Sequence, residues 1–322
     1  MIDNKFIAFP ALLILFQTFA HAETVLVTLE KDNAIAIVDP VAGKLVKSVP
    51  VGKRPRGINL SPDQNKVFIA VSDDNTIKML DAHTLKEIAK LPSGDDPETF
   101  AISPTGDRLY VSNEDDNQVT VIDIASKKAI QKITVGVEPE GIAVSPDNQW
   151  VVSASETTNM LHWIEPIPLT IIAYTLVDPR PRFVIFSPDS KQLWVTSEMA
   201  GTVTILDTAT KQAIKSIKLT VPGVTADKIQ PVGIAIDKQR QWAYVALGPA
   251  NRVAVINAQT LEVEKFLLVG QRVWNLSFSP DQKRLYTTNG ISNDISIIEL
   301  AEHKVTKSIG VGRYPWGVVA KP

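Results

Sequence analysis

The chain has 322 residues, of which 44% are hydrophobic and 21% charged, a composition typical of globular proteins. Its net charge of −2 provides no overall basic field for a nucleic acid or an anionic membrane. The absence of cysteine excludes disulfides, thiolate metal sites, catalytic thiols and covalent attachment of a c-type haem.

The chain begins with a segment that has the pattern of a secretion signal. Lys5 precedes an apolar run over residues 6–19, and Ala20 and Ala22 supply the small residues of a cleavage site. The run is too short to span a bilayer comfortably, and no apolar stretch of spanning length follows it. We expect a cleaved signal over residues 1–22; the alternative is a retained N-terminal anchor.

From there the sequence repeats itself seven times. Each repeat has a Gly/Pro-rich loop, a short apolar run and a turn of the type Ser-Pro-Asp. The first residue of the turn recurs every 42 residues, apart from one interval of 50: Ser61, Ser103, Ser145, Ser187, Asp237, Ser279 and Lys321. Self-similarity at such a period indicates a repeat architecture.

One repeat predicts four short strands, at residues 99–102, 109–112, 118–122 and 129–135. The alternation of β-branched or aromatic residues with polar ones, punctuated by turns, is typical of antiparallel strands. Seven such units predict an all-β fold, a seven-bladed β-propeller of four-stranded antiparallel blades.

The two ends of the chain predict how the ring closes. After the signal the sequence starts with a second strand near Thr24, and it stops after a first strand within residues 313–322. The last blade should therefore be completed by both termini, which leaves no unpaired inner edge. We expect residues 23–322 to form a single propeller domain.

Two segments depart from the repeat. The 50-residue interval contains about eight extra residues, 221–228, between a fourth strand and the next first strand. In blade 4, prolines and apolar residues replace the usual polar turn and Lys-rich strand. This segment predicts either a partner contact or a buried outer strand, and the candidate contact residues are Ile167, Leu169, Ile171 and Ile172.

Two positions of the Gly/Pro loop differ strongly from repeat to repeat, although repeats tend to stay alike where only the fold matters. In a propeller these loops share one face, around the channel. The guanidinium groups suit a carboxylate or phosphate and the indoles an apolar wall, so we predict a small anionic ligand or an acidic segment of a partner. The alternative is a structural mouth in which Arg and Glu neutralise one another. The candidate residues are Arg54, Arg56, Glu98, Glu140, Arg180, Arg182, Arg272, Trp274, Tyr314 and Trp316.

Catalytic patterns are poor. His83, His162 and His303 are not at metal-ligand spacing, and no nucleophile or phosphate-cradling motif occurs. We therefore expect no catalytic residue, no metal and no bound cofactor, and we favour a non-enzymatic protein.

The segment 109–113, Leu-Tyr-Val-Ser-Asn, together with the Val-x-Val-Ile-Asp and Ser-Pro-Asp elements, resembles the YVTN family of β-propeller repeats. The exported, cysteine-free, seven-repeat chain is most similar to β-propeller proteins found beside PQQ-dependent alcohol catabolism in Gram-negative bacteria. The resemblance implies a periplasmic binding or accessory protein, whose partner would be a quinoprotein dehydrogenase or a transport system. Alternatives on the same fold are a lactonase-like hydrolase, a haem or quinone redox domain and a nucleic-acid-binding propeller.

Overall fold

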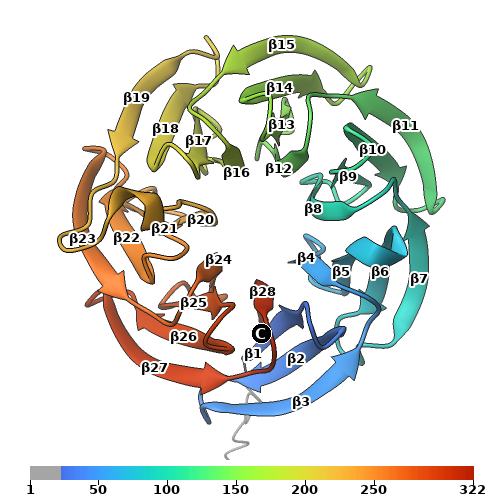
Figure 1. The fold of residues 1–322 in the computed structure, drawn as a ribbon. Helices are drawn as coiled ribbons and strands as arrows, with labels where there is room; N and C mark the ends of the chain where they lie inside the picture. Colours follow the sequence, from blue (N-terminus) through green and yellow to red (C-terminus); the bar gives the residue numbers. More distant parts are fainter. Residues whose placement is uncertain (1–22) are drawn as a thin grey trace, which may run out of the picture.

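The computed structural model describes residues 23–322, so the predicted signal at 1–22 lies outside the described residues. Seven four-stranded antiparallel sheets surround a central axis (Figure 1). The fold is a seven-bladed β-propeller, which confirms the prediction from the repeats. Within the described chain, no helix is long and apolar enough to cross a membrane.

Each blade runs from an inner to an outer strand. Blade 1 contains β28 (Pro315–Lys321), β1 (Thr24–Leu29), β2 (Ala34–Asp39) and β3 (Lys44–Pro50); blade 2, β4 (Pro55–Leu60), β5 (Lys66–Val71), β6 (Thr76–Asp81) and β7 (Glu87–Pro92); blade 3, β8 (Pro97–Ile102), β9 (Arg108–Asn113), β10 (Gln118–Asp123) and β11 (Lys128–Thr134); blade 4, β12 (Pro139–Val144), β13 (Val151–Ser155), β14 (Met160–Glu165) and β15 (Thr170–Leu176). Blade 5 contains β16 (Pro181–Phe186), β17 (Gln192–Ser197), β18 (Thr202–Asp207) and β19 (Ala213–Lys218); blade 6, β20 (Ile234–Ile236), β21 (Trp242–Ala246), β22 (Arg252–Asn257) and β23 (Glu262–Leu268); blade 7, β24 (Val273–Phe278), β25 (Arg284–Asn289), β26 (Asp294–Glu299) and β27 (Lys304–Gly310).

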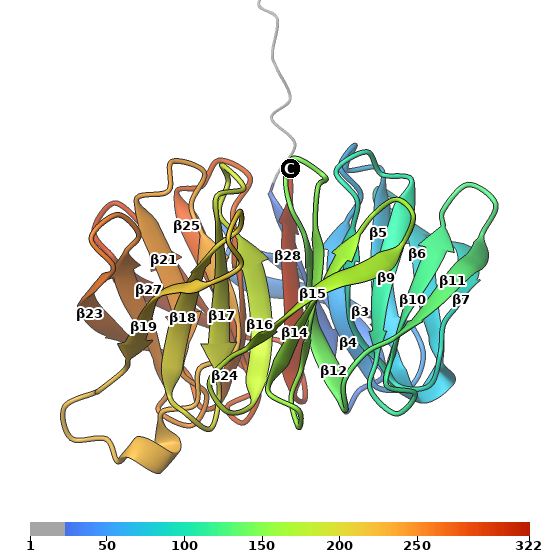
Figure 2. The same ribbon diagram turned by 90° about the horizontal axis from the view of Figure 1, so that it is seen from above.

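Both termini complete blade 1, as the sequence predicts. β28 pairs antiparallel with β1, with Leu26 opposite Val319. Two short 3₁₀ helices interrupt the pattern, at Ser72–Asp74 and at Ala226–Lys228. The second lies in the connection from β19 to β20, the predicted site of the extra residues, and projects from the lower rim in Figure 2.

The core lies between neighbouring blades, where the second and third strands are almost fully buried. Trp163 of β14 packs with Val184 and Phe186 of β16, so blades 4 and 5 share one apolar cluster. Its ring and that of Phe186 meet edge to face with centroids 6.3 Å apart. Each blade thus buries its apolar faces against its neighbours, and an isolated blade would leave both exposed.

A repeated asparagine fixes the loops on one face of the ring. In blade 3, Asn117 adopts φ 54° and its side-chain oxygen accepts a hydrogen bond of 3.0 Å from the backbone N–H of Glu138 in the next loop. Glu138 is itself left-handed, with φ 56°. Six asparagines, 21 residues before their partners, do the same: Asn33, Asn75, Asn117, Asn159, Asn251 and Asn293. Asn tolerates this conformation better than most residues, so the sequence itself sets the loop geometry.

Candidate functional site at the mouth of the ring

Three positions in each blade meet on this face of the ring, which we call the mouth. The loop position and the strand position flank the proline at the start of the first strand, or shortly before it in blade 6 (Val273 takes its place in blade 7). The facing position follows the second strand. The loop positions are Arg54, Asp96, Glu138, Arg180, Gln230, Arg272 and Tyr314; the strand positions are Arg56, Glu98, Glu140, Arg182, Val232, Trp274 and Trp316; the facing positions are Glu30, Ser72, Glu114, Glu156, Glu198, Gly248 and Gly290.

The backbone brings the facing and loop positions together. The N–H of Glu114 donates to the carbonyl of Asp96 at 3.0 Å, and the N–H of Glu156 donates to that of Glu138 at 2.9 Å. The same bond recurs in blades 1, 2, 5 and 7. Side chains from two distant parts of each repeat therefore converge on the mouth.

Arg182 is the centre of the ion pairs on one side of the mouth. Its guanidinium lies 2.7 Å from Glu140, 2.5 Å from Glu156 and 3.7 Å from Glu198. All four side chains are at most 9% exposed. Burial lowers the pKa of Arg182, but the three carboxylates outweigh it and raise the pKa above its ordinary value. Arg182 is a permanent counter-charge that joins blades 4 and 5.

Arg54 and Arg56 join blades 1, 2 and 3 in the same way. Arg54 pairs with Asp96 and, at 2.6 Å, with Glu98, and Arg56 contacts Glu98 at 2.9 Å. Arg56 also lies 3.7 Å from Glu30. Glu98 is 1% exposed, so two arginines hold one buried carboxylate.

Arg180 and Arg272 complete the pairing. Arg180 lies 2.9 Å from Glu156 and 3.0 Å from Glu198. Arg272 of blade 7 contacts Glu198 of blade 5 at 3.4 Å and donates to Gln230 of blade 6 at 2.9 Å. Blade 6 has only Val and Gly at its other two mouth positions, and these small side chains leave room for the Arg272 side chain to extend across the blade to Glu198.

The two tryptophans occupy the strand positions of blades 7 and 1. Arg272 stacks 4.3 Å from the Trp274 ring centroid, and Arg56 lies 5.2 Å from that of Trp316. A Cβ atom on Gly290 would lie 2.5 Å from Nε1 of Trp274, so glycine at the facing position makes space for the indole. Trp316 also lines a cavity of about 280 Å³ between the first strands, together with Phe100, Phe183 and Phe278.

Burial raises the pKa of one carboxyl beside Arg182. Glu140 is 1% exposed, and its pKa is raised well above the ordinary value by burial and by a hydrogen bond and repulsion from Glu156, although Arg182 opposes the shift. Glu140 therefore loses its proton at a higher pH than a solvent-exposed carboxyl would.

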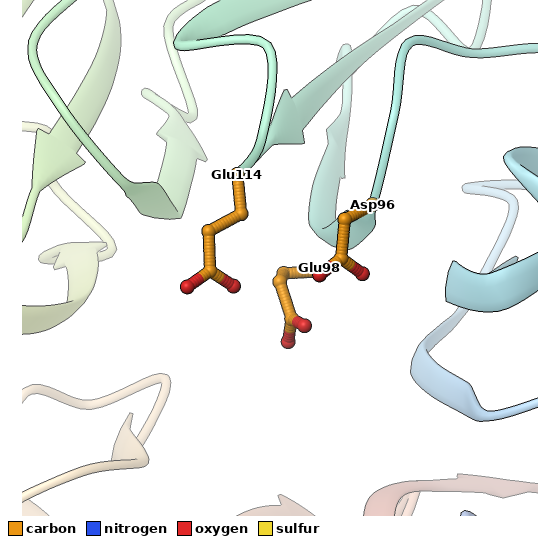
Figure 3. A group of neighbouring side chains, drawn as sticks. All are labelled: Asp96, Glu98 and Glu114. Atoms are coloured by element: carbon orange, nitrogen blue, oxygen red, sulfur yellow. The ribbon is translucent and has the colours of Figure 1, made fainter.

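Glu114 lies beside two other carboxylates of the mouth. Figure 3 shows its side chain turned toward those of Asp96 and Glu98. Within residues 23–322 it forms no ion pair. Its pKa is raised to about 7, first by burial and then by repulsion from Glu98, Glu156 and Asp96.

The trio of Asp96, Glu98 and Glu114 could in principle hold a metal, because one oxygen of each lies within 4.8 Å of the others. Arg54 already pairs with Asp96 and Glu98, however, and Arg56 pairs with Glu98 as well. With two guanidinium charges beside three carboxylates, the trio offers only about one net negative charge. This donor set suits a monovalent cation better than a divalent one.

The sequence-predicted mouth residues do converge. All of the predicted arginines contact carboxylates, the arrangement that the alternative of a structural mouth describes, so an anionic ligand would have to compete with these contacts. The sequence reasoning missed the facing position, and with it Glu30, Glu114, Glu156 and Glu198. Their spacing of 42 residues, one or two residues after the aligned second strands, is the signal that would have found them.

The predicted contact segment of blade 4 lies far from the mouth, at the outer rim. Ile167 and Ile172 are exposed there, whereas Leu169 and Ile171 pack against the apolar cluster between blades 3 and 4. Those two are half-buried, which agrees at these positions with the alternative of a buried outer strand. His162 is buried in β14, and His303 meets Tyr244 at 3.0 Å at the turn after β26.

The raised pKa of Glu114 predicts a pH effect on stability. A carboxyl that holds its proton more tightly when folded stabilises the fold at low pH, and this contribution is lost as the pH rises through about 7. Glu114→Gln should therefore make the fall in unfolding free energy between about pH 5 and pH 8 shallower than in the wild type. Urea unfolding at several pH values measures this, and identical slopes would contradict the assignment.

Comparisons with known proteins agree with this fold. Residues 126–285 match the model of the choice-of-anchor I domain, and residues 62–158 match that of the cytochrome D1 heme domain. No curated protein matches the chain.

Three solved structures show the architecture again. A putative 6-phosphogluconolactonase from Bacteroides fragilis has 17% identity and a TM-score of 0.80, covering 95% of this chain and 99% of its own. Dihydro-heme d1 dehydrogenase NirN in complex with DHE has 14% identity and a TM-score of 0.68, covering 92% and 74%. Hydrazine synthase of Kuenenia stuttgartiensis has 21% identity and a TM-score of 0.57, covering 77% and 96%. At these identities the likeness establishes the fold alone: the chain is a seven-bladed β-propeller.

Proposed function

We propose that the chain is a non-enzymatic binding propeller whose mouth takes a positively charged ligand. The observation that carries this proposal is the excess of acid at the mouth. The three positions of the seven blades hold eight carboxylates and five arginines, and among the described residues Glu114 and Glu138 are left without an ion pair. A cation near Glu114 would neutralise this excess in a setting where burial strengthens the attraction.

An anionic ligand is disfavoured by the same geometry. It would have to displace carboxylates from arginines that they already contact, and Arg182 is only 7% exposed. The acid excess also repels phosphate groups, which argues against the nucleic-acid alternative.

The ligand we propose is an organic ammonium or guanidinium group, free or on a basic segment of a partner. Such a group carries the single charge that the trio of Asp96, Glu98 and Glu114 can offset. Its apolar part would contact the aromatic side chains of the mouth, where Trp274 is half-buried and Tyr314 is 42% exposed.

The proposal also includes a cellular location and a class of partner protein. The resemblance to YVTN propellers found beside PQQ-dependent alcohol catabolism, together with the signal-like segment 1–22, supports an exported accessory protein in the periplasm. A quinoprotein dehydrogenase or a transport component there would supply the basic segment.

Haem binding is the second candidate, because residues 62–158 match a heme-domain model. The residues present do not fit it well: the mouth positions contain no histidine, and His162 and His303 lie in blade 4 and at a turn beyond β26. We derive no reaction from this candidate. An absorbance spectrum of the purified protein with a Soret band would favour it.

The proposal is tested with tyramine, an aromatic ammonium, and with 4-ethylphenol as the matched neutral probe. Calorimetric titration is carried out at about pH 8, where Glu114 is mostly ionised. The protein should bind tyramine at least about tenfold more tightly than 4-ethylphenol, because a charge-assisted contact is worth about 1.5–3 kcal/mol. Glu114→Gln should remove the difference. Equal binding of the two probes, or binding of neither, would contradict a cation site.

A further inference from the structure

The outer strand of blade 4 differs in charge from all the other outer strands. β15 has the sequence Thr-Ile-Ile-Ala-Tyr-Thr-Leu and contains no charged residue. The remaining six outer strands each contain lysine: Lys44 in β3, Lys90 in β7, Lys128 in β11, Lys215 in β19, Lys265 in β23 and Lys304 in β27. Lysine on an edge strand opposes pairing with another chain, so β15 alone lacks this protection.

The solvent-facing side of β15 is apolar as well. Ile172, Tyr174 and Leu176 are 41%, 64% and 72% exposed. An exposed isoleucine at the position of Ile172 is a common feature of the repeat, since Ile130 of β11 and Ile214 of β19 are also exposed. Tyr174 distinguishes blade 4, because the corresponding residue of β11 is Lys132. The exposed leucine at position 176 has a counterpart in Leu268 of β23, which is 61% exposed.

Side-chain contacts within the blade also fix the position of β15. The Tyr174 ring meets that of His162 edge to face at 5.4 Å, and Thr175 accepts a hydrogen bond of 3.0 Å from Trp163. β15 pairs with β14 on one side and with no described strand on the other, at the outer rim of the ring (Figure 1). Its outward edge therefore offers ordered backbone groups to another strand.

We propose that β15 pairs with β15 of a second copy of the chain, antiparallel and across a two-fold axis. The argument for this occupant is charge: any lysine-bearing outer strand would place like charges near each other in such a pair, and β15 has none. Centred on Ala173, the pairing sets Ile172 opposite Tyr174 of the second copy and Thr170 opposite Leu176. Each apolar side chain meets an apolar or neutral partner, and the interface is self-complementary, as a two-fold contact must be.

The oligomeric state of the purified protein tests this proposal. Sedimentation velocity at micromolar concentration should give the mass of two copies. Tyr174→Lys should raise the dissociation constant of the dimer at least about tenfold, since it places a charge in the strand pair on both sides. Ile130→Lys is the control, because it also places a lysine at an exposed apolar residue of an outer strand, β11, and should leave the dimer intact.

Each outcome decides the question. If Tyr174→Lys lowers the melting temperature, Leu176→Lys replaces it, because Leu176 is the more exposed of the two. A wild type that is monomeric at all concentrations, or a dimer that survives both substitutions, would overturn the proposal. A monomer that binds another protein through this strand would assign the surface to a different partner.

Discussion

Replacing Arg182 by methionine is expected to lower the free energy of unfolding by about 3–5 kcal/mol at neutral pH, the range for breaking a buried ion pair by removing one partner. The substitution keeps most of the side-chain volume but leaves Glu140, Glu156 and Glu198 without their shared guanidinium. The cost is large because Arg182 is buried and joins blades 4 and 5.

The loss should depend on pH. Carboxyls freed from Arg182 can take up protons, so acidification should shrink the difference between variant and wild type. Arg313→Met is the control: Arg313 also pairs with a carboxylate, Asp32, but its side chain is 69% exposed, and the expected loss is about 0–1 kcal/mol. Urea unfolding of both variants measures the effect. Equal, small losses would show that the mouth network contributes little to stability.

Deleting residues 313–322 is expected to abolish cooperative unfolding. These residues contain β28, which supplies the inner strand of blade 1 and pairs with β1 over most of its length. Its loss would expose Val25 and Val27 of β1 to solvent and leave the ring open. The clusters between blades 1, 2 and 7 would lose part of their packing at once, because Val318 and Val319 belong to them.

Calorimetry on the truncated chain measures this directly. The expected trace lacks a sharp transition, and the protein should bind a dye for exposed apolar surface. Adding the ten residues back as a separate peptide is the control, since partial recovery would show that the effect comes from the missing strand. A truncated protein that melts like the full chain would refute this view of ring closure.

The repeat made the fold predictable from sequence. A constant period of 42 residues specifies the number of blades, and the start in a second strand with the end in a first strand specifies the closure. The segment 221–228 was recognised as an insertion because it changes only one interval. Local turn chemistry, such as the hydroxyl of Ser145 accepting from the N–H of Trp150, fixes each repeat independently of its neighbours.

The site was predictable only in part. The varied loop residues pointed to the mouth, where Glu138 accepts a hydrogen bond from Thr157 and Glu140 pairs with Arg182. The charge state was not accessible from sequence, since Glu156, which pairs with Arg182, lies 26 residues earlier and at the end of another strand. The period alone does not show which side chains converge. Their positions depend on the asparagine side chains that hydrogen-bond the loops and on the close approach of the loops.

The measurement that tests the central claim most directly is proton release on binding. Near pH 7 about half of the Glu114 carboxyls hold a proton, and a bound ammonium group should displace it. Titration of tyramine in two buffers of different ionisation enthalpy should therefore show release of roughly half a proton per ligand near pH 7 and almost none near pH 9. Glu114→Gln should abolish the release. Tight binding without proton exchange, unchanged in Glu114→Gln, would place the ligand elsewhere and contradict the account.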